Sequence, residues 1–207
     1  MAERGDSPRL FDTDLLERLS RVQPAIPLLL WAPVIAWLLW PSVTDSPMGM
    51  WSLMQLAGGG LLVWTLTEYL MHRFLFHWEP RSPLGQRLVF IIHGVHHEAP
   101  DDRTRLLMPP VPAILAAAVL YGGFWGILGR PWVDPFFAFF LIGYLAYDYT
   151  HFALHARRPR GRLGRALRRS HMRHHFATPR ARWGVSSPLW DWIFRTTGEP
   201  SRRRRLA

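Results

Sequence analysis

The sequence predicts an all-α integral membrane protein in which four transmembrane helices carry a helical cap on one face. Two observations lead to this prediction. Four apolar runs each approach the roughly 20 residues that an α-helix needs to cross a bilayer. All ten histidines of the 207-residue chain fall into four groups beside these runs. The composition agrees, because 49% hydrophobic residues and 11 tryptophans are high values for a soluble domain.

The first predicted element lies in an N-terminal segment, residues 1–23. Ser7 and Pro8 form a favourable helix start, and the residues after them place an apolar stripe on one helical face: Phe11, Leu15, Leu16, Leu19 and Val22. This pattern predicts an amphipathic helix over residues 7–22 that lies on the membrane surface.

Residues 24–207 are expected to form one membrane domain. Its spans are predicted at about 24–41, 50–71, 111–129 and 133–150. Pro33 and Pro135 lie inside the first and the fourth, where a transmembrane helix tolerates proline.

The arginines predict the orientation of these spans. All 25 basic residues are arginine: four precede the first span, five lie between the second and third, fifteen follow His155, and only Arg130 lies in the opposite loops. Cytoplasmic loops carry an excess of positive charge. Both termini, the middle segment and every histidine are therefore expected in the cytoplasm.

The cytoplasmic cap is expected to comprise residues 72–110 and 151–197, followed by a basic tail, 198–207. One cap helix should run from Ser82 to His97 along the membrane interface. Another should follow a break at residues 159–161 and carry a buried stripe that ends in histidines: Leu163, Leu167, His171 and His174. The arginines of this second helix fall mainly on its other faces.

The histidine groups indicate a metal site. Residues three or four apart share a face of a helix, so His93, His96 and His97 can aim several imidazoles into one cavity, as can His171, His174 and His175. The pair His151 and His155 has the same spacing. The pair His72 and His77 is five apart, which suits two ligands aimed at different points. Ten imidazoles exceed the four to six ligands that one ion usually takes, so two ions are expected to share them.

The chemistry of the ligands narrows the class of ion and of site. The chain has no cysteine, so any metal is held by nitrogen or oxygen. Imidazole nitrogen favours iron, zinc, copper or nickel over magnesium or calcium. A structural zinc site normally has four ligands, often cysteines, and matches ten histidines poorly.

The net charge of +10 admits anionic lipid, an acidic redox protein or nucleic acid as a partner. The positive-inside rule explains the same arginines, so nucleic acid is not expected.

Five carboxylates are candidates for supporting the ligands. Glu68 lies one turn before His72, and Asp148 precedes His151 by three residues; both lie near the cytoplasmic end of a span, where an ionisable group usually has a partner. A carboxylate that accepts a hydrogen bond from the second nitrogen of a ligand imidazole fixes its tautomer. Asp101, Asp102 and Asp191 either serve in the same way or cap turns.

The histidine motifs and their surroundings resemble a known family. The stretch from His72 to Pro110, HRFLFHWEPRSPLGQRLVFIIHGVHHEAPDDRTRLLMPP, resembles the core of the fatty acid 2-hydroxylases of the membrane fatty acid hydroxylase superfamily. The resemblance continues in DYTHFALH (148–155), HMRHHF (171–176) and WGVSSPLWDWIF (183–194), and covers roughly residues 60–197. HGVHH followed by RLLMPP is its most specific part.

The resemblance implies that all ten histidines are ligands of a dinuclear metal centre: His72, His77, His93, His96, His97, His151, His155, His171, His174 and His175. Enzymes of this kind use two iron ions and O2 to hydroxylate C2 of a fatty acyl chain, free or in a sphingolipid. Zinc can replace iron in recombinant protein, because zinc lies above Fe²⁺ in the divalent affinity order. Arg103, Arg105 and Met108 are candidates for the mouth of an apolar substrate cleft, with membrane-surface packing as the alternative for them.

The resemblance also bears on partners and alternatives. Many eukaryotic members carry a fused cytochrome b5 domain, for which the 23 residues before the first span are too few. An external electron donor, a ferredoxin or a cytochrome b5-like protein, is therefore expected. The lysine-free chain suggests a bacterial inner membrane. Oxidation or desaturation of a sterol, a carotenoid or another acyl carbon remains an alternative, as does a membrane protein that binds or transports metal.

Overall fold

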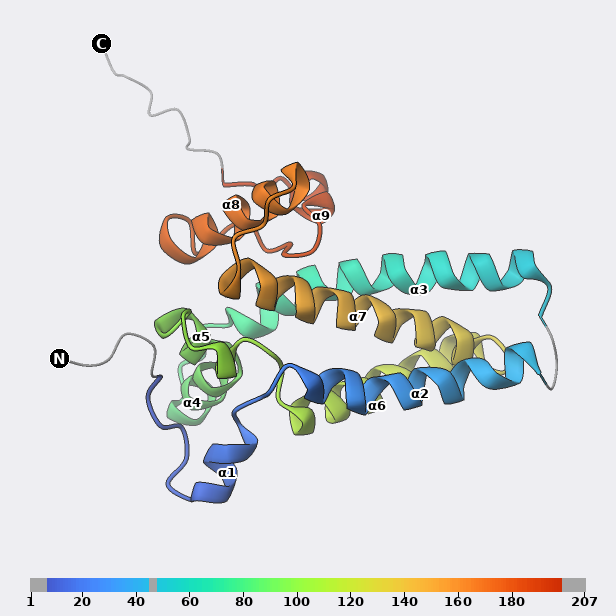
Figure 1. The fold of residues 1–207 in the computed structure, drawn as a ribbon, viewed down its shortest axis with the longest axis horizontal. Helices are drawn as coiled ribbons and strands as arrows, with labels where there is room; N and C mark the ends of the chain where they lie inside the picture. Colours follow the sequence, from blue (N-terminus) through green and yellow to red (C-terminus); the bar gives the residue numbers. More distant parts are fainter. Residues whose placement is uncertain (1–6, 45–47, 199–207) are drawn as a thin grey trace, which may run out of the picture.

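Four long helices run side by side and form a bundle in the computed structural model, which describes residues 7–44 and 48–198 (Figure 1). No strand occurs among these residues. The helices are α2 (Ala25–Val43), α3 (Met50–Leu70), α6 (Pro110–Leu128) and α7 (Val133–Ala156). Three of them match the expected spans within two residues, whereas α7 continues six residues beyond the predicted end. The histidines at 151 and 155 therefore lie on the bundle's own helix.

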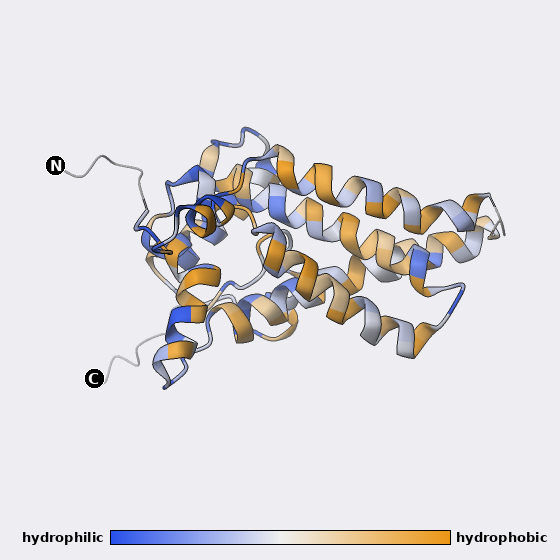
Figure 2. Cartoon of the chain, turned by 90° about the horizontal axis from the view of Figure 1, so that it is seen from below, coloured by the Kyte–Doolittle hydropathy of each residue, from blue (hydrophilic) through white to orange (hydrophobic). Residues whose placement is uncertain are grey.

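Length and apolar composition alone mark two segments as candidate membrane spans, α2 and the stretch Arg103–Leu128 that contains α6. The other two long helices, α3 and α7, carry buried polar residues near their cap ends, including Glu68 and Asp148. Hydrophobic residues dominate the bundle, and hydrophilic residues gather at its cap end (Figure 2).

The helix α7 is the centre of the bundle, because it packs against α2, α3 and α6. Its buried aromatic residues, including Phe140 and Tyr144, meet Trp31 of α2 and Trp64 of α3. A glycine allows α3 to approach closely. A Cβ atom on Gly60 would lie 2.4 Å from the carbonyl oxygen of Phe136. Small residues permit this kind of close contact between helices.

The cap is built from short helices and α8. The first is a π-helix, η1 (Met71–Phe76), which continues α3 without a break. The segment predicted as one helix from Ser82 consists of α4 (Pro83–Val89), a second π-helix η2 (Phe90–Gly94) and α5 (Val95–Glu98). The Ser82 side chain accepts a hydrogen bond from the Gly85 amide and so caps α4, as its position before Pro83 predicts. A 3₁₀ turn, η3 (Arg103–Arg105), precedes α6, and α8 (Arg162–Phe176) and α9 (Leu189–Ile193) complete the cap.

The N-terminal segment differs from its prediction. Only Asp14–Leu19 forms a helix, α1, and the prediction of a helix over residues 7–22 is wrong. The hydroxyl of Ser7 donates to Asp102 across the fold (2.6 Å), and the Leu10 amide donates to Glu17 (2.8 Å), so these groups are engaged outside a helix. Leu15, Leu16 and Leu19 still form an exposed apolar face on α1, while Val22 is buried elsewhere. Most of the predicted basic tail, 199–207, lies outside the described residues.

Candidate metal centre

The ten histidines meet at the cap end of the bundle and form two groups of five. Within each group, one ring nitrogen of every residue lies within 4.8 Å of the others. The first group comprises His72, His77, His93, His97 and His174, and the second comprises His96, His151, His155, His171 and His175. The structure thus divides the histidines equally, which their order in the sequence does not reveal.

Helical spacing explains most of this division. His151 and His155, four residues apart on α7, belong to one group, as do His171 and His175 on α8. His174 lies between the last two in sequence but points to the first group. The helix α8 therefore supplies both groups, and so does the stretch η2 to α5.

The π-helix η1 brings His72 and His77 into the same group. The His77 amide donates to the His72 carbonyl across five residues (3.3 Å), which is the hydrogen bond of a π-helix. This wider turn places residues five apart on one face. The prediction that these two side chains aim at different points is wrong for this reason.

The imidazoles lie in a dry environment that keeps them neutral. Burial lowers the pKa of His72, His93, His96 and His171 well below its usual value, and neighbouring imidazoles lower it further. The pKa of the less buried His77 falls to about 4 for the same reasons. A neutral imidazole keeps the lone pair that binds a cation.

The ring nitrogens are spaced as ligands of a metal ion. Nε2 of His155 and Nε2 of His171 are 2.7 Å apart, Nε2 of His151 and of His96 are 2.9 Å apart, and Nε2 of His174 and of His77 are 3.1 Å apart. Nitrogens bonded at about 2.0–2.1 Å to one ion, at right angles, lie about 3 Å from each other. The buried Nε2 of His72 has no hydrogen-bond partner. The residues therefore fit two nitrogen-bound ions, one for each group.

Backbone carbonyls orient three of the imidazoles. Nδ1 of His72 donates to the Trp183 carbonyl (2.6 Å) and Nδ1 of His174 donates to the Ala181 carbonyl (2.8 Å). Nδ1 of His151 donates to the Leu106 carbonyl (2.9 Å). Each bond fixes the tautomer and turns Nε2 toward its group. The sequence carried no signal for these partners, because a carbonyl belongs to every residue type.

Two of the predicted carboxylates act on these carbonyls and not on the imidazoles. Asp191 accepts hydrogen bonds from the amides of Trp183 (3.0 Å) and Gly184 (2.8 Å). Glu68 accepts from the amides of Val185 (2.6 Å) and Ser186 (2.9 Å) and from the Ser186 hydroxyl. The prediction of a direct carboxylate–imidazole hydrogen bond is wrong for Glu68, and Asp191 follows the alternative prediction of a carboxylate that caps a turn. These carboxylates instead fix the loop 181–186, whose carbonyls hold His72 and His174.

Two more carboxylates support the loop that carries the Leu106 carbonyl. Asp148 accepts from the Met108 amide (3.3 Å) and from the Tyr144 hydroxyl (3.3 Å). Asp102 accepts from the amide and hydroxyl of Thr104 (2.9 and 2.7 Å), as well as from Ser7. Neither carboxylate contacts an imidazole directly. Asp101 is exposed and has no place at the site.

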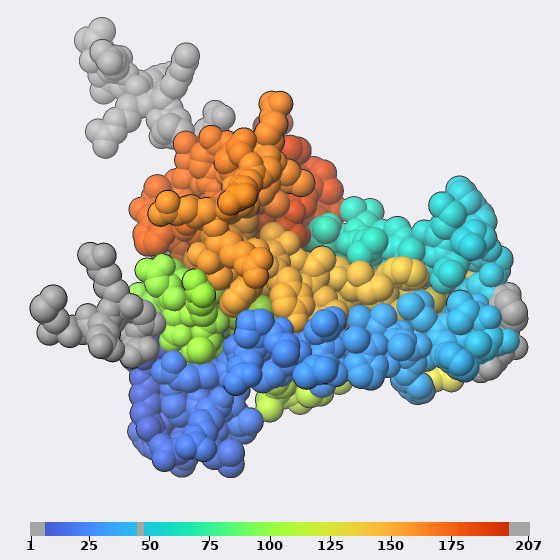
Figure 3. Space-filling view, viewed as in Figure 1, coloured from blue at the N-terminus to red at the C-terminus, as the bar shows by residue number. Residues whose placement is uncertain are grey.

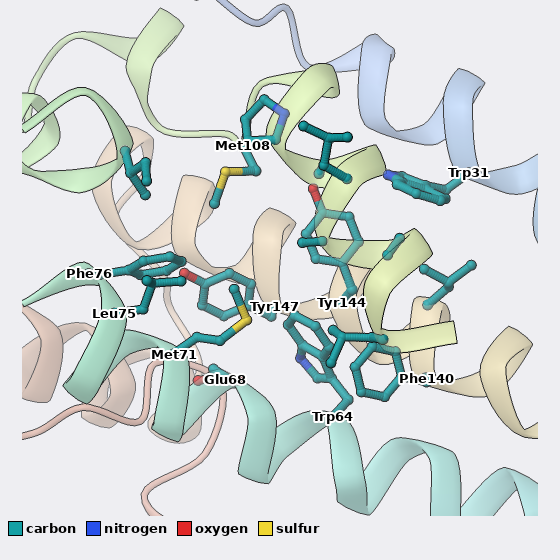
Figure 4. A pocket seen from close by; sticks show the side chains of 18 residues that line it. Trp31, Trp64, Glu68, Met71, Leu75, Phe76, Met108, Phe140, Tyr144 and Tyr147 are labelled. Carbon is teal, nitrogen blue, oxygen red and sulfur yellow. The ribbon is translucent and has the colours of Figure 1, made fainter. Parts of the chain in front are cut away.

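An apolar cavity of about 270 Å³ lies between the helices of the bundle, next to Met108 of the loop that carries the Leu106 carbonyl (Figure 4). Trp31, Trp64, Phe140 and Tyr144 line its deep part. A smaller cavity of about 50 Å³ lies beside the histidines and is lined by His93, His96 and His151. The two cavities share four lining residues: Phe76, Ile92, Met108 and Tyr147. Among them, the sequence predicted only Met108 at the site.

The three residues predicted at the cleft mouth are placed differently from one another. Met108 lines both cavities. The Arg105 guanidinium is buried, forms an ion pair with Glu17 and donates to Ser7 and Ser20, so it fastens the N-terminal segment to the cap. It also borders the small cavity. Arg103 is exposed.

Known proteins match this chain over most of its length. The model of the fatty acid hydroxylase family matches residues 57–196. The chain is 37% identical to the fatty acid 2-hydroxylase of Macaca fascicularis over 91% of this chain and 56% of that protein. It is 35% identical to the dihydroceramide fatty acyl 2-hydroxylase FAH1 of Arabidopsis thaliana over 92% of this chain and 80% of that protein.

A solved structure has the same fold. The structure of full-length Scs7p, in which only the hydroxylase domain is visible, superposes with a TM-score of 0.85 at 33% identity. The match covers 95% of this chain and 75% of that one. The chain spans about half the length of the first of the curated relatives that it matches. The family match, the identities and the shared fold together establish that this chain belongs to the fatty acid hydroxylase family.

Proposed function

We propose that this protein is an O2-dependent, di-iron lipid hydroxylase that hydroxylates C2 of a fatty acyl chain, free or as the N-acyl group of a sphingolipid. It acts in a membrane, which we take to be a bacterial inner membrane, with α2, α3, α6 and α7 as spans. The cap and both termini lie in the cytoplasm, as the arginine distribution predicts. The ten histidines hold the two ions, five to each.

One observation carries the proposal: the apolar cavity and the small cavity beside the histidines are adjacent and share four lining residues. Phe76, Ile92, Met108 and Tyr147 line both spaces, so they lie between an acyl chain in the bundle and the histidines. C2 is the second carbon from the head of the chain, so the head must lie in the cap while the tail extends toward Trp31 and Trp64. The names of the relatives, fatty acid 2-hydroxylase and dihydroceramide fatty acyl 2-hydroxylase, support this position.

The chemistry divides between the metals and the chain. When bound, iron supplies the oxidising power that an unactivated C–H bond requires. The protein's residues do the positioning. The aromatic walls of the cavity exclude water from the tail and contribute about 0.8 kcal/mol for each methylene removed from water. The carbonyls of Trp183, Ala181 and Leu106 hold three imidazoles in one tautomer.

Metal transport would be a rival function, but the distribution of the histidines disfavours it. A transport path needs ligands across the bilayer. All ten histidines belong to the two groups at the cap end. His151 and His155 lie at the cap end of α7, and no histidine lies deeper in α2, α3, α6 or α7 to continue such a path.

Lipid analysis tests the proposed function. The protein is expressed in a bacterium that lacks 2-hydroxylated lipids, together with a ferredoxin system, and total lipids are analysed by mass spectrometry. We expect a gain of one oxygen, about 16 Da, with fragmentation that places it at C2. The His174→Ala variant, produced at the same level, serves as the inactive control. Oxygen at another carbon contradicts the C2 assignment, and unchanged lipids in the presence of iron-loaded protein contradict the hydroxylase.

A further inference from the structure

The outer face of α8 forms a groove lined by arginines. The groove has a volume of about 550 Å³ and opens at the surface of the cap. Its lining, here called the α8 groove, is Arg158, Pro159, Arg165, Arg168, Arg169, Met172, Arg173, Phe176 and Ala177. In Figure 3 this segment, coloured orange, faces the viewer and no other part of the described chain covers it.

The positive charge of the α8 groove has no partner within the described chain. No aspartate or glutamate occurs between Asp148 and Asp191, a stretch that contains ten arginines. Among the ion pairs formed by residues 7–44 and 48–198, none involves an arginine of the groove. Four of these arginines lie at helical spacing on α8, and Arg158 lies just before the helix, so their like charges repel each other. A surface of this kind is complementary to an anionic partner.

The α8 groove lies directly behind the second histidine group. His171 and His175 project from the inner face of α8, while Arg165, Arg169 and Arg173 lie on its outer side. Nε of Arg168 donates to the Leu154 carbonyl (2.9 Å), next to His155. Only the thickness of one helix, about 10 Å, separates a partner in the groove from the second group.

The proposed reaction requires electrons from outside the chain. Hydroxylation converts a C–H bond and O2 into C–OH and water, and this balance needs two electrons and two protons from a donor. We propose that the α8 groove is the docking surface for an acidic electron-carrier protein, which delivers the electrons through α8 to the second histidine group. This inference rests on the proposed function.

The composition of the cap favours a protein over a lipid surface as the occupant. Most exposed apolar side chains of the cap lie on other elements, such as Leu15 of α1, Leu84 of α4 and Trp192 of α9. The exposed Leu163 of α8 does not line the groove. The α8 groove instead combines arginines with one exposed aromatic ring, Phe176, which is 70% exposed. A charged rim around an apolar contact is typical of transient protein interfaces.

Binding and turnover measurements test the inference with the full chain in neutral phosphatidylcholine nanodiscs. The probe is an acidic [2Fe–2S] ferredoxin, and the test variant is Arg165→Glu with Arg169→Glu. The control is Arg18→Glu with Arg81→Glu, which changes the net charge equally at two other exposed arginines of the cytoplasmic side. We expect the test variant to bind the ferredoxin at least about tenfold more weakly and with a smaller dependence on salt, while the control stays within about twofold.

The outcomes separate this inference from the proposed function. Hydroxylation driven by ferredoxin should fall with binding. The single turnover of protein that is first reduced with dithionite, freed of excess dithionite and then exposed to O2 should not change in the test variant. Equal loss of binding in the control, or full binding in the test variant, overturns the docking surface. So does a test variant that keeps ferredoxin binding but loses its attachment to anionic phosphatidylglycerol vesicles. Groove-dependent binding without any hydroxylated lipid after this pre-reduction and exposure to O2 supports the docking surface and contradicts the proposed function.

Discussion

The most informative perturbation is Asp191→Asn, because Asp191 is one step removed from the histidines. Its carboxylate accepts hydrogen bonds from the Trp183 amide, the Gly184 amide and the Thr196 hydroxyl (3.0, 2.8 and 2.7 Å). An asparagine keeps the shape of the side chain but has only one accepting oxygen. One buried amide of the loop therefore loses its acceptor, which costs about 1–3 kcal/mol.

This cost should appear as weaker metal binding in one group only. The loop that Asp191 fixes presents the Trp183 carbonyl to His72, which belongs to the first group. Replacing a residue that supports a ligand typically costs 10–100-fold in metal affinity. Since Asp191 acts through a peptide unit, we expect the lower end, about tenfold, or about 1.4 kcal/mol. The second group is oriented through Leu106 and should keep its affinity.

Native mass spectrometry at graded chelator concentrations measures this effect as the number of ions retained. Asp191→Asn should lose its first ion at about tenfold lower chelator than the parent protein and its second at the same concentration. Asp134→Asn is the matched control, because Asp134 also accepts a hydrogen bond, from Tyr121 (2.6 Å), but lies in the first turn of α7, at the end of the bundle remote from the cap. Equal weakening of both ions, or the same loss in Asp134→Asn, would refute this account of the loop.

Three further predictions concern the groups, the cavity and the bundle. His174→Ala and His175→Ala change adjacent residues, but each should remove the ion of a different group. Native mass spectrometry should therefore show one ion in each single variant and none in the double variant. Ala116→Phe places a ring in the cavity and should abolish turnover of long acyl chains while both ions are retained. Ala118→Phe, on the exposed side of α6, should have little effect in the lipid assay. Equal activity of the two variants contradicts the cavity as the acyl site. Gly60→Ala should destabilise the protein by about 1–3 kcal/mol, because its Cβ would overlap the Phe136 carbonyl. Gly58→Ala should not destabilise it, because a Cβ atom there has no other atom within 4 Å. Thermal unfolding in detergent measures both variants, and equal midpoints would contradict the close α3–α7 contact.

The sequence predicted the long helices well, because their signal is local. Apolar runs bounded by loop residues located α2, α3 and α6 within two residues. The end of α7 was less accurate, since a helix that continues from a bundle into a cap shows no change in periodicity where its polarity changes. The segment before α1 was missed because Ser7 bonds to Asp102, a partner 95 residues away that no local pattern contains.

The candidate site was predictable in its residue types and not in its arrangement. Ten histidines in four groups indicated metal, but their division into two groups depends on the π-helix at η1 and on the placement of α8 beside α5. The carboxylates were identified as supports, yet their partners are amides of a loop. The cavity walls come from α2, α3, α6 and α7, and small residues such as Ala113 line it without any distinctive chemistry.

The continuity of α7 has a consequence for the choice of acyl chain. One uninterrupted helix carries His151 at the cap and Phe140 in the deep wall of the cavity, eleven residues earlier. At about 1.5 Å for each residue, this interval is about 16 Å long. For the proposed acyl substrate, this interval sets the distance from the histidines to the deep wall, because the hydrogen-bonded backbone of α7 does not stretch. An insertion of one full turn between Phe140 and His151 would lengthen the distance between these two positions by about 5.4 Å without changing any of the histidines.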